Sequence, residues 1–254
     1  MKGFCPLASG SKGNSIYVGT EETKLLIDMG ISLKALTQKL GEIDVDLGEI
    51  DAILVTHEHG DHIRGLERVA LKLGIPVFSN SDTAKAILSE AREKPRFKIF
   101  STGETFEFGD IEIHPFSIQH DTLDPVAFTL KMQGLKIGVC ADLGFVTTLV
   151  KARLEACDYL YIEANHEPSM VYACPRPMLY KQRVLGRQGH LSNEACAQLI
   201  QEIDHPGLKH IYLAHLSGEC NNAELAVKRV QEHVKRELSI SVAYQDKVSR
   251  ILKW

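Results

Sequence analysis

The sequence predicts an α/β fold in which two β-sheets pack face to face and helices cover their outer sides. In each half of the chain, pairs of strand-like runs come first and strands mixed with helical segments follow, and this order is typical of packed layers of sheet and helix. With 254 residues and 44% hydrophobic composition, the chain can bury a substantial core. We find no repeat, low-complexity stretch or flexible linker, and therefore expect one domain over residues 1–254.

Apolar runs and helical spacing locate the elements of the first half. Residues 15–18 and 24–27 flank a polar turn and predict a hairpin. Residues 61–73 have apolar side chains at helical spacing and predict one continuous helix. The other elements expected here are helices at 32–40 and 81–92 and strands at 52–55, 76–78 and 97–100.

The second half repeats the pattern. Residues 126–132 and 136–141 predict another hairpin, and Ser192 suits the N-cap of a helix at 193–203. The other expected strands are 111–118, 159–163, 210–214, 240–243 and 249–252, and the other expected helices are 145–156 and 223–234.

Composition narrows the function classes. A net charge of −4 gives no global case for a nucleic-acid or membrane partner, so an anionic substrate would have to be met by local charge. No apolar run approaches the roughly 20 residues that span a bilayer, and the N-terminal segment lacks a signal-peptide pattern. The six cysteines form no Cys-x-x-Cys pair, which indicates reduced thiols and a cytoplasmic location.

The strongest motif is a cluster of histidines that directly follows the strand at 52–55. His57 and His59 can share a direction in extended backbone, whereas Asp61 and His62 turn toward a second point at the start of a helix. Imidazole and carboxylate groups are expected ligands for zinc, manganese or iron. A zinc-protease helix is excluded, because its histidines would stand four positions apart.

With this motif, the chain resembles the metallo-β-lactamase superfamily. The resemblance implies a four-layer αβ/βα sandwich with a metal site at one edge of the sheets, and three further ligands. His120, Asp142 and His215 each follow a strand-like run in the expected order. Two divalent ions (Zn, Mn or Fe) are then implied: one held by His57, His59 and His120, one by Asp61, His62 and His215, with Asp142 bridging.

Two variants of this site are disfavoured. Flavodiiron relatives carry Glu where this chain has His59, and B1 lactamases carry Cys where it has Asp142. Cys140 stands two positions away, inside an apolar strand, and is interpreted as a buried thiol. Two cations that share a hydroxide serve phosphodiesters well, because their transition state is highly anionic, but they also serve thioesters and lactams.

Three segments bear on the substrate. In the Gly/Ser loop at 8–15, Ser9, Ser11 and Asn14 could approach a phosphate, although composition alone is equally compatible with an ordinary loop. Polar residues also end the strand at 159–163 and precede the helix at 193–203. Between Glu167 and Glu194 there is no acidic residue, but there are four cationic ones. This stretch is either a phosphate-binding surface or an ordinary basic helix face. These cations are Arg176, Lys181, Arg183 and Arg187.

Together these segments resemble the YycJ/WalJ-type branch of the superfamily. The residues that carry the likeness are Ala8–Asn14, Thr56–His62, His120-Asp121, Asp142-x-Gly144, Glu163-x-Asn165-His166, Gly189–Asn193 and Leu213–Ser217. One departure is Ala164, where serine is common. The resemblance implies a 5′→3′ exonuclease that binds the ends of duplex DNA.

The expected catalytic residues are Asp61, His190 and His166. We expect His190 to contact the scissile phosphate or to protonate the leaving 3′ oxygen, with His166 and Asn165 lining the same pocket and Arg187 binding phosphate. A structural role for either histidine is the alternative. Competing functions are a small-molecule or cyclic phosphodiesterase, a thioesterase, an RNA-processing nuclease and a scaffold that only binds partners. A degenerate scaffold predicts missing ligands, whereas all seven positions are filled.

Overall fold

The computed structural model describes residues 1–254, which divide into two compact units. Unit 1 comprises residues 1–113, 122–125 and 243–254, and unit 2 comprises residues 114–121 and 126–242. Each unit buries its own cluster of apolar side chains. None of the helices has the length and apolar character that crossing a membrane requires. All six cysteines are free thiols, as expected.

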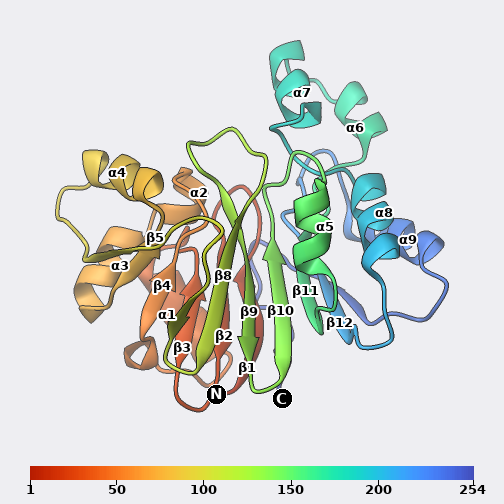
Figure 1. Ribbon diagram of the computed structural model, residues 1–254. Helices are drawn as coiled ribbons and strands as arrows, with labels where there is room; N and C mark the ends of the chain where they lie inside the picture. The colour runs from red at the N-terminus through yellow and green to blue at the C-terminus, as the bar shows by residue number, and fades with distance from the viewer. The chain divides into compact units, whose positions relative to one another are not determined.

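Unit 1 is built on a six-stranded sheet in which every strand pairs with its neighbour in the sequence (Figure 1). The first three strands are antiparallel, which confirms the predicted hairpin, and the next three continue the sheet in parallel. The strands are β1 (Gly3–Ala8), β2 (Ser15–Gly19), β3 (Lys24–Ile27), β4 (Ala52–Leu54), β5 (Val77–Ser79) and β6 (Phe97–Ile99).

The helices of unit 1 connect its parallel strands. They are α1 (Leu33–Gly41), the 3-10 turn η1 (Leu47–Glu49), α2 (Gly60–Ile63), α3 (Leu66–Leu73) and α4 (Ser81–Glu90). The prediction of one helix over 61–73 is wrong, because the helix is interrupted at Gly65, which separates α2 from α3. The Gly65 N–H donates to the Met29 carbonyl at 2.9 Å, and a Cβ on Gly65 would lie 1.9 Å from the Ile31 carbonyl oxygen. This close approach fixes the start of α3.

The second sheet has seven strands, in the order β13-β12-β11-β10-β9-β8-β7. The β9–β10 hairpin is confirmed, and β10 to β13 are parallel. β7, a strand of only three residues, is not predicted by the sequence, and the predicted strand at 249–252 forms a single bridge between Leu252 and Phe4. The strands are β7 (Phe106–Phe108), β8 (Ile111–Ser117), β9 (Val126–Met132), β10 (Leu135–Cys140), β11 (Tyr159–Glu163), β12 (His210–Ala214) and β13 (Ile240–Val242).

The helices of unit 2 include two, α6 and α7, that the sequence analysis does not predict. α8 begins after Ser192, whose hydroxyl accepts from the Ala195 N–H, so the predicted N-cap is confirmed. The predicted helix at 145–156 is shorter, because the Thr147 side chain caps it two residues inside the expected start. The helices are α5 (Thr148–Leu154), α6 (Pro168–Ala173), α7 (Met178–Leu185), α8 (Asn193–Ile203) and α9 (Ala223–His233).

Gly30 provides a test of how tightly unit 1 packs around the loop that carries Asp61. A Cβ on Gly30 would lie 1.6 Å from the Asp61 carbonyl oxygen, whereas a Cβ on Gly41 meets nothing within 4 Å. We expect Gly30→Ala to lower the free energy of unfolding by about 3 kcal/mol or more. Gly41→Ala should leave it unchanged or slightly raised. Urea titration measures both, and equal stability of the two variants would contradict this packing.

Candidate metal centre

The four donors of the histidine cluster gather within unit 1, in the loop after β4 and in the short helix α2 that follows it. The His57 ring centroid lies 4.1 Å from that of His62 and 4.9 Å from that of His59. Asp61 follows in the first turn of α2, with its Oδ2 3.6 Å from His62 Nε2. His59 has extended backbone and stands at the N-cap of α2, so the chain turns into the helix between His59 and Asp61.

Asp28, a buried residue just past β3, fixes the orientation of two histidines in this cluster through hydrogen bonds. Its Oδ2 lies 2.7 Å from His62 Nδ1, and its carboxylate accepts both the N–H and the hydroxyl of Thr56 at 2.8 Å. Because that hydroxyl donates to Asp28, it accepts from His57 Nδ1 at 2.9 Å. We therefore assign the ring protons of His57 and His62 to Nδ1. Their Nε2 atoms then carry lone pairs, the form that binds a metal.

The Gly/Ser loop reaches the same cluster through Asn14. The Asn14 Nδ2 lies 3.0 Å from His62 Nε2 and 3.2 Å from Asp61 Oδ2, and its Oδ1 accepts from the Gly10 N–H. Ser9 is buried and donates its N–H to the Tyr244 carbonyl, whereas Ser11 is exposed. Asn14 thus supports two expected ligands. A phosphate contact by Ser9, Ser11 or Asn14 stays a prediction.

In unit 2, Glu163 at the end of β11 has the same kind of contacts as Asp28 in unit 1: it is a buried carboxylate that bonds to the Nδ1 atoms of histidines. It is 0% exposed, and its Oε1 lies 2.8 Å from His190 Nδ1 and 3.0 Å from His215 Nδ1. Its Oε2 accepts the backbone N–H groups of Leu143 and Leu191 at 2.7 and 3.0 Å. No role for Glu163 is predicted from the sequence. The available signal was a carboxylate that ends an otherwise apolar strand, because a buried charge requires partners.

The expected ligands of unit 2 also gather. Asp142 Oδ1 lies 3.4 Å from the Nδ1 atoms of His190 and His215, and these residues with Glu163 place their donor atoms within 4.8 Å of one another. His120 donates from Nδ1 to the Gly189 carbonyl at 3.0 Å, which assigns its lone pair to Nε2, 3.8 Å from Asp142 Oδ1. Both units therefore present the imidazole and carboxylate donors that suit a divalent metal.

Three of these residues have left-handed backbone conformations just past the ends of strands. The φ angles of Asp28, Asp142 and His215 are 60°, 54° and 53°, after β3, β10 and β12. Such a conformation costs on the order of 1–3 kcal/mol for a non-glycine residue and is concentrated at functional sites. The surrounding hydrogen bonds hold these turns and set the direction of each side chain.

The two histidines expected to be catalytic differ in their electrostatic environment. Burial lowers the pKa of His190, but the carboxylates of Glu163 and Asp142 outweigh it and raise that pKa overall. Burial lowers the pKa of His166 to about 4, so this imidazole is neutral at pH 7. The Asn165 side chain donates to the His215 carbonyl at 2.7 Å. Of these residues, His190 is the one placed to hold a transferable proton.

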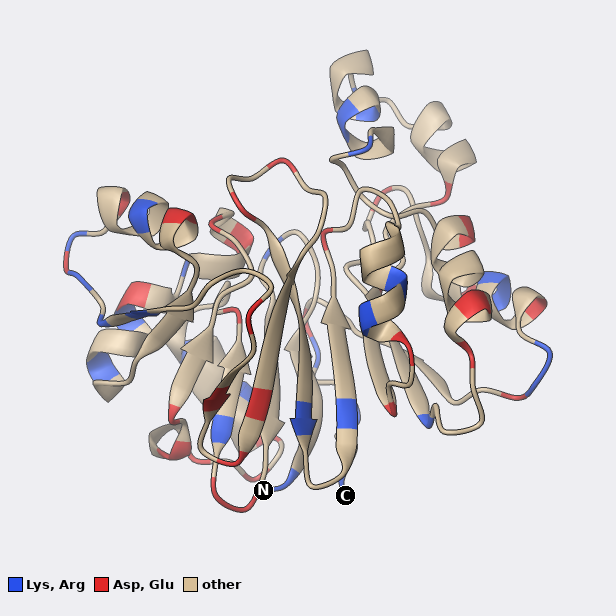
Figure 2. Cartoon of the chain, viewed as in Figure 1, with Lys and Arg blue, Asp and Glu red and all other residues tan.

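Half of the expected cationic stretch is paired with carboxylates within unit 2. Arg176 forms a two-pronged ion pair with Glu219, and Arg183 Nε lies 2.6 Å from Asp121 Oδ2. Figure 2 shows Lys and Arg in blue on α7, the helix that carries Lys181 and Arg183. Lys181 donates to the Tyr172 carbonyl, and the Arg187 guanidinium lies 4.4 Å from the centroid of the Phe145 ring. Two of the four cations are thus compensated by carboxylates.

The role of Asp28 can be tested against an aspartate of the same conformation. Asp44 has a φ of 56° and is exposed, so Asp44→Asn is a matched control for Asp28→Asn. We expect Asp28→Asn to lower metal affinity about 10- to 100-fold, because the amide no longer fixes the His62 tautomer. Competition with a chromophoric chelator measures the affinity. An unchanged affinity for both variants would contradict the assignment.

Comparisons with known proteins agree with this geometry. Residues 23–216 match the model of the β-lactamase superfamily domain. The chain is 37% identical over 232 residues to the exodeoxyribonuclease YycJ of Bacillus anthracis, covering 90% of this chain and 88% of that protein. It is 36% identical over 244 residues to the exodeoxyribonuclease WalJ of Streptococcus pneumoniae, covering 94% and 91%.

Solved structures show the fold. The metallo-β-lactamase fold protein YhfI from Bacillus subtilis aligns with a TM-score of 0.74 at 14% identity, covering 97% of this chain and 99% of that chain. The predicted fold class is therefore confirmed: an α/β sandwich of two mixed sheets with helices.

Proposed function

The chain belongs to the metallo-β-lactamase superfamily and is a metal-dependent hydrolase, and we propose that it is a 5′→3′ exonuclease acting on the ends of double-stranded DNA. The observation that carries the proposal is the identity of 36–37% to proteins named exodeoxyribonucleases, over about nine-tenths of both chains. The residues of the site are compatible with this chemistry, as follows.

The donor set fits a pair of divalent ions. We assign His57, His59 and His120 to one ion, Asp61, His62 and His215 to the other, and Asp142 as the bridge, as the family resemblance implies. The tautomer assignments within each unit support this, because four of these histidines hold the Nδ1 proton in a hydrogen bond to the protein. When bound, the ions would lower the pKa of the attacking water and neutralise charge on the phosphate.

His190 would supply the proton for the leaving group. As the P–O3′ bond breaks, the 3′ oxygen takes a proton from His190 Nε2, because Nδ1 stays bonded to Glu163 Oε1. Glu163 acts as a positioning residue: it touches the acid and the expected ligand His215 but not the substrate. One buried carboxylate would thus fix the orientations of both the general acid, His190, and the expected metal ligand, His215.

The function is tested on 5′-end-labelled linear duplex DNA and on a closed circle of the same sequence, with manganese or zinc added. We expect release of the label from the linear DNA, no cleavage of the circle, and loss of activity with a chelator. An RNA duplex of the same sequence is the control for substrate class. Cleavage of the circle, or of RNA at the same rate, would count against a DNA exonuclease.

The general acid is tested by His190→Ala. We expect kcat to fall about 10²- to 10⁴-fold, the usual contribution of a positioned acid, while the metal content stays the same. His233→Ala is the control, because His233 lies on α9 and bonds to Glu194 on the helix side of unit 2. Metal analysis and turnover are measured on the same preparations. Unchanged turnover in His190→Ala would overturn the role.

A further inference from the structure

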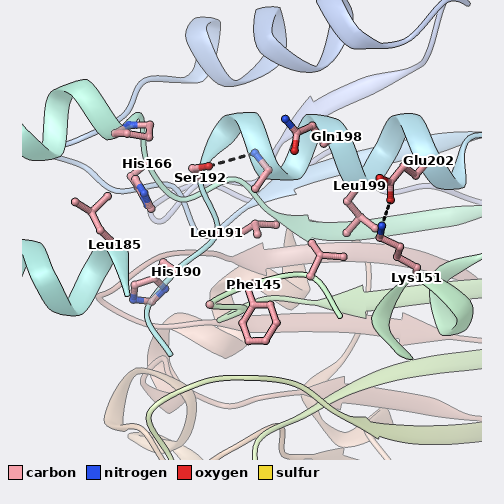
Figure 3. A pocket seen from close by; sticks show the side chains of 14 residues that line it. Phe145, Lys151, His166, Leu185, His190, Leu191, Ser192, Gln198, Leu199 and Glu202 are labelled. Atoms are coloured by element: carbon pink, nitrogen blue, oxygen red, sulfur yellow. Dashed lines mark hydrogen bonds and ion pairs between the residues drawn. The ribbon is translucent and has the colours of Figure 1, made fainter. Parts of the chain in front are cut away.

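Unit 2 contains a pocket of about 440 Å³ beside His190 that none of the steps above uses (Figure 3). Its volume lies within the range of about 300–1,000 Å³ typical of ligand pockets. The turn after Asp142, the segment that begins at His166, and α8 all contribute to its lining. In the view of Figure 3, His190 lies at one end and an ion pair between Lys151 and Glu202 at the other.

The pocket has a buried apolar floor, and a few polar side chains also line it. Leu191 and Leu199 are each about 1% exposed, so they form the floor of the pocket, and the Phe145 ring lies along one side. The Arg187 guanidinium lies over that ring, 4.4 Å from its centroid. Gln198, an exposed amide on α8, adds a group that can both donate and accept. A flat, amphipathic ligand suits these surroundings.

His166 points to a ligand independently of the shape. Its side chain lines the pocket and is only 2% exposed, yet its Nδ1 has no hydrogen-bond partner in the protein. A buried polar atom without a partner is costly by about 1–3 kcal/mol, so native proteins rarely leave one unpaired. A ligand with a polar edge would complete this bond.

We propose that the pocket binds the base of the nucleotide that is released, with the base along Phe145 and its polar edge toward His166 and Gln198. The inference rests on the proposed function, in which His190 protonates the 3′ oxygen of that nucleotide. The sugar bonded to this oxygen must then lie beside His190, and the pocket begins at that point. Because every base has an aromatic face, this binding tolerates any sequence.

The test compares duplexes that end in an ordinary 5′ nucleotide or in an abasic tetrahydrofuran residue. We expect Phe145→Ala to raise KM for the ordinary end about fivefold to 150-fold, as loss of one base–aromatic contact does. The abasic end should show the same KM with the wild type and the variant. Gln198→Ala should raise KM for the ordinary end less strongly. Gln201→Ala, at an exposed position on the same helix but outside the pocket, should not.

Calorimetry separates this inference from the function on which it rests. We expect the metal-loaded wild type to bind deoxyadenosine 5′-monophosphate more tightly than deoxyribose 5-phosphate, and Phe145→Ala to remove the difference. If Phe145→Ala fails to fold, two comparisons still test the pocket. These are the affinities of the wild type for the two ligands, and the KM values of Gln198→Ala and Gln201→Ala.

Two results distinguish the failures. DNA degraded from its 5′ ends, with no effect of the base on KM or affinity, overturns the pocket assignment alone. Base-dependent binding of the nucleotide without degradation of DNA overturns the exonuclease and leaves the pocket as a nucleotide site.

Discussion

The buried carboxylates of Asp28 and Glu163 impose the constraint on which the rest of the site depends. Each accepts a bond from the Nδ1 of at least one histidine and from at least one backbone N–H group that comes from another part of its unit: that of Thr56 for Asp28, and those of Leu143 and Leu191 for Glu163. An ionised carboxylate away from water is tolerated only when such bonds surround it. The same bonds that keep these charges inside the protein therefore also orient the imidazoles, so folding and the preparation of the site are one process.

This arrangement explains the backbone conformations just past the ends of the strands. The left-handed turns at Asp28, Asp142 and His215 would be unfavourable in a loose loop, and each requires a rigid setting. The strands before these turns supply that setting, since the last three residues of β3, the last four of β10 and all of β12 are buried. Donor groups on such a frame lose little entropy when an ion binds, because their positions are already fixed.

Local sequence patterns could predict only part of this. His57, His59, Asp61 and His62 lie close together in the chain, and His120, Asp142 and His215 each follow a recognisable strand, so both the donors and the fold class could be predicted. The roles of Asp28 and Glu163 depend on partners 20 to 52 residues away, which no periodicity encodes. The break at Gly65 arises from contact with residues 29–31, and three-residue β7 is too short for a pattern.

The ion pairs around α7 have a consequence for how the protein would meet a polyanion. Arg176 and Arg183 already have carboxylate partners, and either would have to exchange that partner for a phosphate before contributing to adhesion. The affinity of a protein for a nucleic acid falls with ionic strength because each Lys or Arg that contacts a phosphate releases a condensed cation. Docking through residues 176–187 would therefore depend on salt less steeply than the four basic residues of this segment imply, with Lys181 and Arg187 carrying most of that dependence.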